Sequence, residues 1–97
     1  MINIIFKKEN GLCIEAQGHA EFAKKDDIVC AAVSSLVGTL AYSVSHSPAF
    51  CGNISLENGY AHIFTKDNSL LPYFEFTLTG LRLIGENYPE NVKITLL

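Results

Sequence analysis

A histidine and a cysteine, His19 and Cys30, lie on either side of one short charged segment. A cysteine thiolate is a strong nucleophile, and histidine is the side chain whose proton exchange falls closest to neutral pH. The charged residues between them are expected to form a loop, which could close back and bring the two side chains within hydrogen-bond reach. The pair therefore predicts nucleophilic catalysis by a thiol, with the histidine as its base.

Cys30 is expected in the first turn of a helix whose N-cap is Asp27. The first N–H groups of a helix lack acceptors within it, and the helix dipole adds partial positive charge at that end. Both features favour an anionic sulfur, and the same N–H groups could receive an oxyanion. Asp27 could cap the helix or orient His19, and the sequence leaves both roles open. Gly18 lets the backbone turn sharply just before the histidine.

The same residue types also have structural explanations. An isolated cysteine on an apolar helix is usually a small core residue, and Cys13 is expected as buried packing within a strand. His62 has no candidate partner in the sequence. Four side chains could serve as metal ligands, but their spacing matches no usual zinc pair: His19, Cys30, His46 and Cys51. We therefore expect no metal and no other cofactor.

Length and charge limit the possible classes of protein. Ninety-seven residues correspond to a single domain, 1–97, and 48% apolar residues argue against disorder. The net charge is −3, and no run of Lys or Arg is longer than two residues. Both observations argue against direct binding of nucleic acid. The first residues alternate like a strand and do not resemble a signal peptide. We expect a cytoplasmic protein whose three cysteines stay reduced.

Two hairpins, each followed by a helix, organise the chain. Strands are expected at residues 2–7, 12–17, 53–57, 60–65 and 92–96, and helices at 28–45 and 70–88. Asn58-Gly59 is typical of the tight turn of the second hairpin. The order ββα-ββα-β predicts an α+β fold, with a mixed sheet packed against two helices in one layer of each.

The helix expected at 28–45 has no charged residue, and its length would suffice to span a membrane. Its serines, threonine and glycine make it too polar for that role, so we expect no contact with a membrane. A helix that is largely apolar on all sides must be covered. It could form a homodimer interface, or it could pack one face on the sheet and leave its small polar residues in water.

Gly18-His19-Ala20, together with the sequence Asp27 to Ser34, resembles the ribosomal-processing cysteine protease family (Prp), and the similarity extends through Asn87 to Val92. This resemblance implies a homodimeric cysteine endopeptidase. Its substrate would be a large-subunit ribosomal protein, from which it removes a short N-terminal extension by cutting after an aromatic residue. The resemblance makes His19 the general base and Cys30 the nucleophile, and it assigns Gly18, Asp27 and Ser34 to the surrounding site.

Two functions from other classes use the same residues. One is a non-enzymatic, ribosome-associated adaptor, which would bind a peptide in the same place without cutting it. The other is a redox sensor, in which Cys30 would be reversibly oxidised and His19 would only activate the thiol. Fast alkylation of Cys30 near neutral pH would argue against the adaptor.

Overall fold

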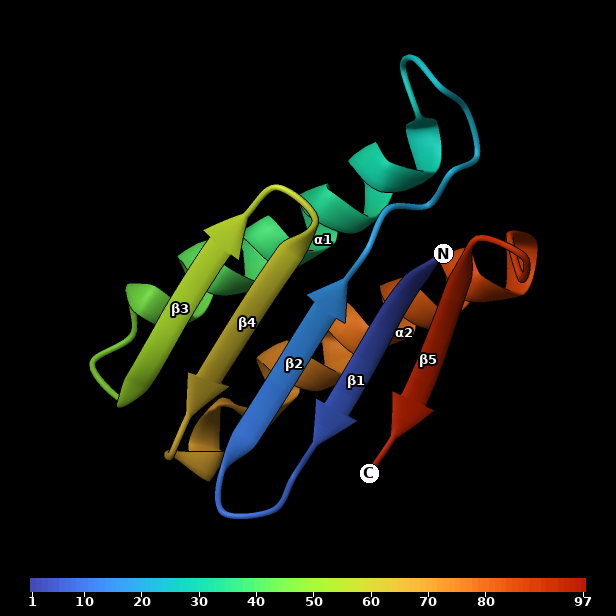
Figure 1. The fold of residues 1–97 in the computed structure, drawn as a ribbon. Helices are drawn as coiled ribbons and strands as arrows, with labels where there is room; N and C mark the ends of the chain where they lie inside the picture. The colour runs from blue at the N-terminus through green and yellow to red at the C-terminus, as the bar shows by residue number, and fades with distance from the viewer.

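The computed structural model describes all 97 residues as one five-stranded sheet with both long helices on one side of it (Figure 1). The elements are β1 Ile2–Lys7, β2 Leu12–Gln17, α1 Ile28–Ser45, β3 Gly52–Glu57, β4 Tyr60–Thr65, α2 Leu71–Asn87 and β5 Val92–Leu96. The predicted α+β class and the predicted order of elements are both confirmed. The expected second helix begins with a 3₁₀ turn at Asn68–Leu70, so α2 itself starts at Leu71.

The sheet is mixed, with the strand order β3-β4-β2-β1-β5. The two hairpins are antiparallel and join through the antiparallel pair β2–β4, whereas β5 runs parallel to β1 at the edge. This order places the start of α1, the end of β2 and the turn between β3 and β4 at the same end of the molecule (Figure 1). Residues far apart in the sequence therefore meet there.

The core lies between the sheet and the helices. Alternate strand residues point to the helical side, and they include Ile4, Ile14 and Ile63, each fully buried. The helices supply the other half of the core through residues at helical spacing: Val29, Val33, Val37, Leu40, Ala41 and Val44 from α1, and Phe74, Leu78 and Leu81 from α2. This packing fixes the position of α1 beneath the hairpins.

By length and composition, α1 is the one helix that could cross a membrane, with a mean hydropathy of 1.7 over 18 residues. Its buried residues all belong to the core described above, and its polar side chains at Ser34, Ser35 and Thr39 are exposed. Packing of one face against the sheet accounts for these buried residues, while Ile28 and Tyr42 remain exposed.

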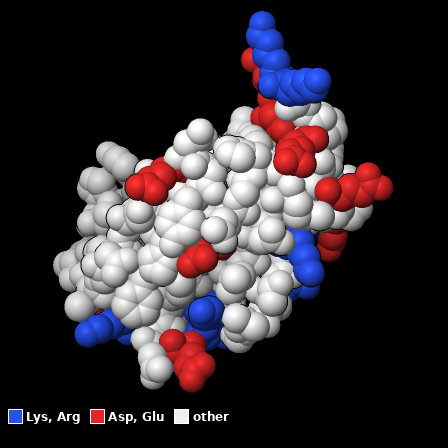
Figure 2. Space-filling model, viewed as in Figure 1, with Lys and Arg blue, Asp and Glu red and all other residues white.

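The other face of the sheet carries no helix, and Figure 2 views the molecule from that side. Charged side chains are scattered over this face, and no continuous basic surface forms there (Figure 2). Cys13 points to this side and is half-buried, so it is less buried than the sequence predicted. The period of two along β2 explains the difference, because Leu12 and Ile14 occupy the core face.

Candidate active site

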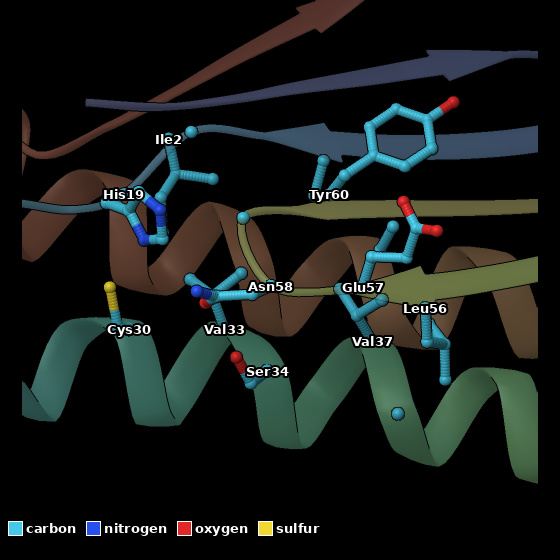
Figure 3. Close-up of a pocket in the computed structure, with 15 residues that line it drawn as sticks. Ile2, His19, Cys30, Val33, Ser34, Val37, Leu56, Glu57, Asn58 and Tyr60 are labelled. Carbon is cyan, nitrogen blue, oxygen red and sulfur yellow. The ribbon is translucent and has the colours of Figure 1, made fainter.

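A pocket of about 420 Å³ lies between α1 and the β3–β4 hairpin, and both His19 and Cys30 line it (Figure 3). His19 follows the end of β2, and Cys30 lies in the first turn of α1. The close-up shows the imidazole above the sulfur, on opposite walls of one end of the pocket (Figure 3). The two side chains are not hydrogen-bonded to each other. Catalytic hydrogen bonds are often long in unliganded enzymes and tighten when substrate binds.

The sulfur of Cys30 accepts a hydrogen bond from the backbone N–H of Ala20, with an N···S distance of 3.2 Å. Ala20 is itself buried, with 1% of its surface exposed. An N–H donor interacts more strongly with a thiolate than with a neutral thiol, and the N-terminal end of α1 acts in the same direction. The sulfur is therefore held by a buried backbone donor at the N-terminal end of α1.

Asp27 caps α1 and also holds the loop that leads to it. One carboxylate oxygen accepts from the N–H groups of Val29 and Cys30 at 2.9 and 3.0 Å. The other accepts from Phe22 and Ala23 at 2.9 and 3.2 Å. These hydrogen bonds, led by that of Cys30, lower the pKa of Asp27 below its usual value, against an opposing effect of desolvation. Asp27 makes no hydrogen bond to His19, so of the two roles left open by the sequence the geometry supports the cap.

The same bonds change the expected place of the oxyanion. The sequence suggested that N–H groups at the start of the helix would be free to receive it. The N–H groups of Val29 and Cys30 instead donate to the Asp27 carboxylate, and that of Ala31 donates to the Asp27 carbonyl at 3.0 Å. The N–H group that does point at the sulfur of Cys30 is that of Ala20. The sequence placed Ala20 in the Gly18-His19-Ala20 motif but indicated no role for its N–H.

Two glycines set the position of His19. Gly18 has a φ of +104°, and a side chain there would collide with the carbonyl oxygen of Met1, so only glycine fits. Its N–H donates to the carbonyl of Gly59 at 2.9 Å. A Cβ atom on Gly59 would lie 2.8 Å from Nε2 of His19, so the turn of the second hairpin packs directly against the imidazole. The sequence indicated this turn but not its contact with the histidine.

The rest of the pocket extends along α1 away from Cys30. Ser34 lines it one turn beyond Cys30, and Gly38 lines it one turn further. A Cβ atom on Gly38 would meet no other atom within 4 Å, so this wall is open. Val37 and the half-exposed Leu56 give the far end an apolar surface (Figure 3). The sequence analysis also missed further lining residues from β3, the turn and β4: Glu57, Asn58, Tyr60 and Ala61.

A second cysteine and histidine meet on the open face of the sheet. His62 Nδ1 lies 4.0 Å from the sulfur of Cys13 and 3.3 Å from a carboxylate oxygen of Glu15. Burial, followed by the negative charge of Glu15, raises the pKa of the Cys13 thiol. No group of three or more His, Cys, Asp or Glu side chains is arranged to hold a metal ion. His62 thus has a partner, Glu15, which faces it across the β2–β4 pair.

Three solved structures with a similar fold come from Staphylococcus aureus and Streptococcus mutans. The essential ribosomal processing protease Prp of Staphylococcus aureus, in complex with a covalently linked product peptide, matches with a TM-score of 0.86 at 22% identity over 100% of both chains. The same protease with a substrate peptide matches with a TM-score of 0.82 at 21% identity, again over 100% of both chains. A Streptococcus mutans protein matches with a TM-score of 0.79 at 27% identity, covering 100% of this chain and 94% of its own.

Of the two sequence comparisons, the one with protein families agrees with this structural similarity. None of the curated proteins compared matches the sequence. Residues 1–93, nearly the whole chain, match the family described as cysteine protease Prp. The match includes every residue placed around the pocket above. This chain belongs to the cysteine protease Prp family.

Proposed function

We propose that this cysteine protease removes a short N-terminal extension from a large-subunit ribosomal protein, cutting after an aromatic residue. In this proposal His19 is the general base and Cys30 the nucleophile. The observation that carries it is the shared pocket, in which an imidazole and a helix-terminal sulfur face the same space. Further support comes from the Staphylococcus aureus relatives, which are described as ribosomal processing proteases and hold substrate and product peptides.

The mechanism follows from these groups. His19 takes the proton from Cys30, and the thiolate attacks the carbonyl carbon of the scissile peptide bond. The imidazolium then gives its proton to the leaving amine, which departs as the new N-terminus of the ribosomal protein. The extension remains as a thioester on the sulfur. A water molecule, deprotonated by His19, hydrolyses the thioester, releases the extension as a carboxylic acid and restores the thiol.

The N–H of Ala20 is the group best placed to stabilise the oxyanion. It points at the sulfur, so a carbonyl carbon bonded to that sulfur would hold its oxygen close to the same donor. Such a donor contributes most when the surrounding protein fixes it before the reaction begins. Loss of one oxyanion donor typically lowers kcat by about 10²–10³-fold.

The apolar lining of the pocket supports an uncharged, bulky residue in the part of the extension that it holds. Val33 and Val37 form its floor on α1, and Leu56 lies at the far end with 52% of its surface exposed. An apolar side chain of the substrate would bury this surface and so gain binding energy. Glu57 is the charged residue on the rim. The extension is therefore expected to avoid acidic residues where it passes that carboxylate.

The proposal includes a homodimer in the cytoplasm. Exposed aromatic side chains on the outer side of the helices offer a surface for a second copy, namely Tyr42 on α1 and Tyr73 and Phe76 on α2, with Phe76 83% exposed. The three free cysteines suit a reducing compartment. Light scattering should give twice the mass of the chain, and Phe76→Asp should give the mass of a monomer. A monomeric wild-type protein would contradict the dimer.

The test of the proposed activity is cleavage of a synthetic peptide that carries the N-terminal extension of the organism's own large-subunit ribosomal protein. Wild type, Cys30→Ser and His19→Ala are compared by mass spectrometry. We expect a single cut after an aromatic residue, absent from Cys30→Ser and strongly reduced in His19→Ala. Binding of the peptide without any cut by the wild type would instead support an adaptor, and cleavage by Cys30→Ser would overturn the assignment of the nucleophile.

A further inference from the structure

The turn between α2 and β5 reaches the loop that carries Ala20. The side-chain amide of Asn91 donates a hydrogen bond to the carbonyl oxygen of Ala20 at 2.9 Å, across 71 positions of sequence, and the bond is partly buried. Close by, the ring of Phe22 meets the ring of Tyr88 edge to face, with centroids 5.3 Å apart. The turn therefore contacts the loop on both sides of Glu21.

Asn91 is itself firmly held. Its backbone N–H donates to the carbonyl of Tyr88 at 3.0 Å, and its carbonyl accepts from the N–H of Ile2 at 2.8 Å. The first bond ties it to the end of α2, and the second ties it to the start of β1. Its side chain is thus presented from a rigid part of the fold and not from a free loop.

The loop needs such a support. Glu21, directly after Ala20, has a φ of +58°, a conformation that residues with side chains adopt rarely and that persists only where the surroundings enforce it. Ala20 is held at three points: its side chain is buried, its carbonyl is bonded to Asn91, and its N–H is bonded to the sulfur of Cys30. Loss of the hydrogen bond between Asn91 and the Ala20 carbonyl would let Ala20 rotate and would move its N–H away from the sulfur of Cys30.

We propose that Asn91 is a positioning residue for proteolysis: by holding the Ala20 carbonyl, it keeps the Ala20 N–H aimed at the sulfur of Cys30 and at the oxyanion. This inference rests on the proposed function for its role in the reaction. This role predicts an effect on kcat and not on substrate binding. The Ala20 N–H acts on the reacting atoms, while the apolar part of the pocket is left unchanged. Loss of Asn91 should therefore lower kcat much more than it raises KM.

The test uses Asn91→Asp, which keeps the shape of the side chain but places an acceptor oxygen against the Ala20 carbonyl. Asn87→Asp is the matched control, because the amide of Asn87 donates at the same distance, 2.9 Å, but to its own helix at Leu83. We expect Asn91→Asp to lower kcat by about 10–100-fold, with KM changed by less than about twofold. Asn87→Asp should leave both constants at the wild-type value.

Asn91→Ser keeps the test valid if the aspartate variant fails to fold, because a serine hydroxyl is too short to replace the amide. Folding of each variant is checked by thermal melting, and rates are measured well below the melting temperature. A kcat within about twofold of wild type in a folded Asn91→Asp or Asn91→Ser would overturn the proposal. A rise in KM equal to the whole loss in kcat/KM would overturn it as well.

Alkylation of Cys30 separates this inference from the proposed function, because it requires no substrate. The rate of reaction with iodoacetamide at pH 7 should fall in Asn91→Asp and stay unchanged in Asn87→Asp. If the wild type fails to cut the ribosomal peptide and yet this difference in rate is seen, the proposed function is wrong and the positioning role stands. If the alkylation rates of both variants equal that of wild type, the positioning role is wrong.

Discussion

Two cysteine–histidine pairs occur in this small chain, and they differ in their position in the fold and in the groups that surround each sulfur. Cys30 and His19 meet in a pocket at the N-terminal end of α1. Cys13 and His62 meet on the open face of the sheet, where the sulfur lies 4.0 Å from the imidazole nitrogen. The second pair is the one with a direct sulfur–nitrogen contact, and yet it lies outside the pocket that Cys30 and His19 line.

The difference lies in what else faces each sulfur. Cys30 receives a backbone N–H and sits at the positive end of a helix. Cys13 faces the carboxylate of Glu15, and burial together with that charge raises the pKa of its thiol. In addition, a single nitrogen of His62, Nδ1, faces both Glu15 and Cys13, so the carboxylate competes with the sulfur for it. A nearby histidine alone therefore does not distinguish Cys30 from Cys13, whereas the groups facing each sulfur do.

Replacement of each cysteine by serine should give the largest difference in cleavage rate between the two sites. Cys30→Ser should lower peptide cleavage by more than about 10³-fold, because no nucleophile would remain at the pocket. Cys13→Ser should cleave within about twofold of the wild-type rate. Both rates come from the same timed peptide assay, with circular dichroism as the check on folding. Equal losses in the two variants would show that the distinction between the two sites is false.

Replacement of each histidine by alanine should give the second-largest difference in rate between the two sites. His19→Ala removes the proposed base, and loss of general-base catalysis typically costs about 10²–10⁴-fold in rate. His62→Ala removes only a partly exposed pair with Glu15, so we expect nearly normal kcat and a small drop in melting temperature. Steady-state kinetics on both purified variants measures this. A normal rate in His19→Ala would remove the histidine from the mechanism.

Alkylation sharpens the comparison without substrate. At pH 7, iodoacetamide should modify Cys30 faster than the exposed Cys51, and Cys13 should be the slowest of the three. Because the pKa of Cys13 is raised above the ordinary thiol value of 9.0, its alkylation should increase only in more alkaline solution. Mass spectrometry of digested samples, taken at intervals between pH 6 and pH 10, gives the rate for each cysteine. Reaction of Cys13 at the rate of Cys30 would contradict the account.

The smallest expected effect concerns the pH dependence of stability. The pKa of Asp27 is lower in the folded chain than in the unfolded chain, so its stabilising effect is complete above the unfolded value of about 4. That effect is lost as the pH falls below this value and through the folded pKa. The melting temperature of the wild type should therefore fall more steeply between pH 5 and pH 2.5 than that of Asp27→Asn.

Asp26→Asn is the matched control for this measurement, because the carboxylate of Asp26 accepts none of the hydrogen bonds made by Asp27. It should keep the wild-type slope. At neutral pH, Asp27→Asn should also lower cleavage by about tenfold, because one acceptor oxygen becomes a donor facing the loop or the helix start. Identical slopes for all three proteins would show that Asp27 does not hold this region together.

The sequence predicted those features of the fold that are determined by residues close together along the chain. Apolar alternation gave the bounds of β1 and β2, the Asn58-Gly59 pair indicated the second hairpin, and the cap at Asp27 placed Cys30 in the first turn of α1. Each of these features is decided within a few residues. The pairing of His19 with Cys30 in one pocket was expected from the loop between them, and the structure brings them together.

The features that the sequence could not reveal depend on contacts between distant segments. The register of β2 against β4 sets Glu15 opposite His62, and it makes the turn at Gly59 a wall for His19. The contact between Asn91 and Ala20 arises because β5 runs beside β1. A local pattern carries no information on such pairings, because the same strands could align in more than one register.

The most direct test of the central claim is to find which cysteine a substrate-like reagent modifies. The reagent is the N-terminal cleavage product of the synthetic peptide, made with a chloromethyl ketone in place of its carboxyl group, so that a thiolate displaces chloride and becomes alkylated. The account predicts one adduct, located on Cys30 by mass spectrometry of the digested protein, formed in step with the loss of activity and nearly absent from His19→Ala. An adduct on Cys13 or Cys51 that forms as fast as that on Cys30 would contradict it.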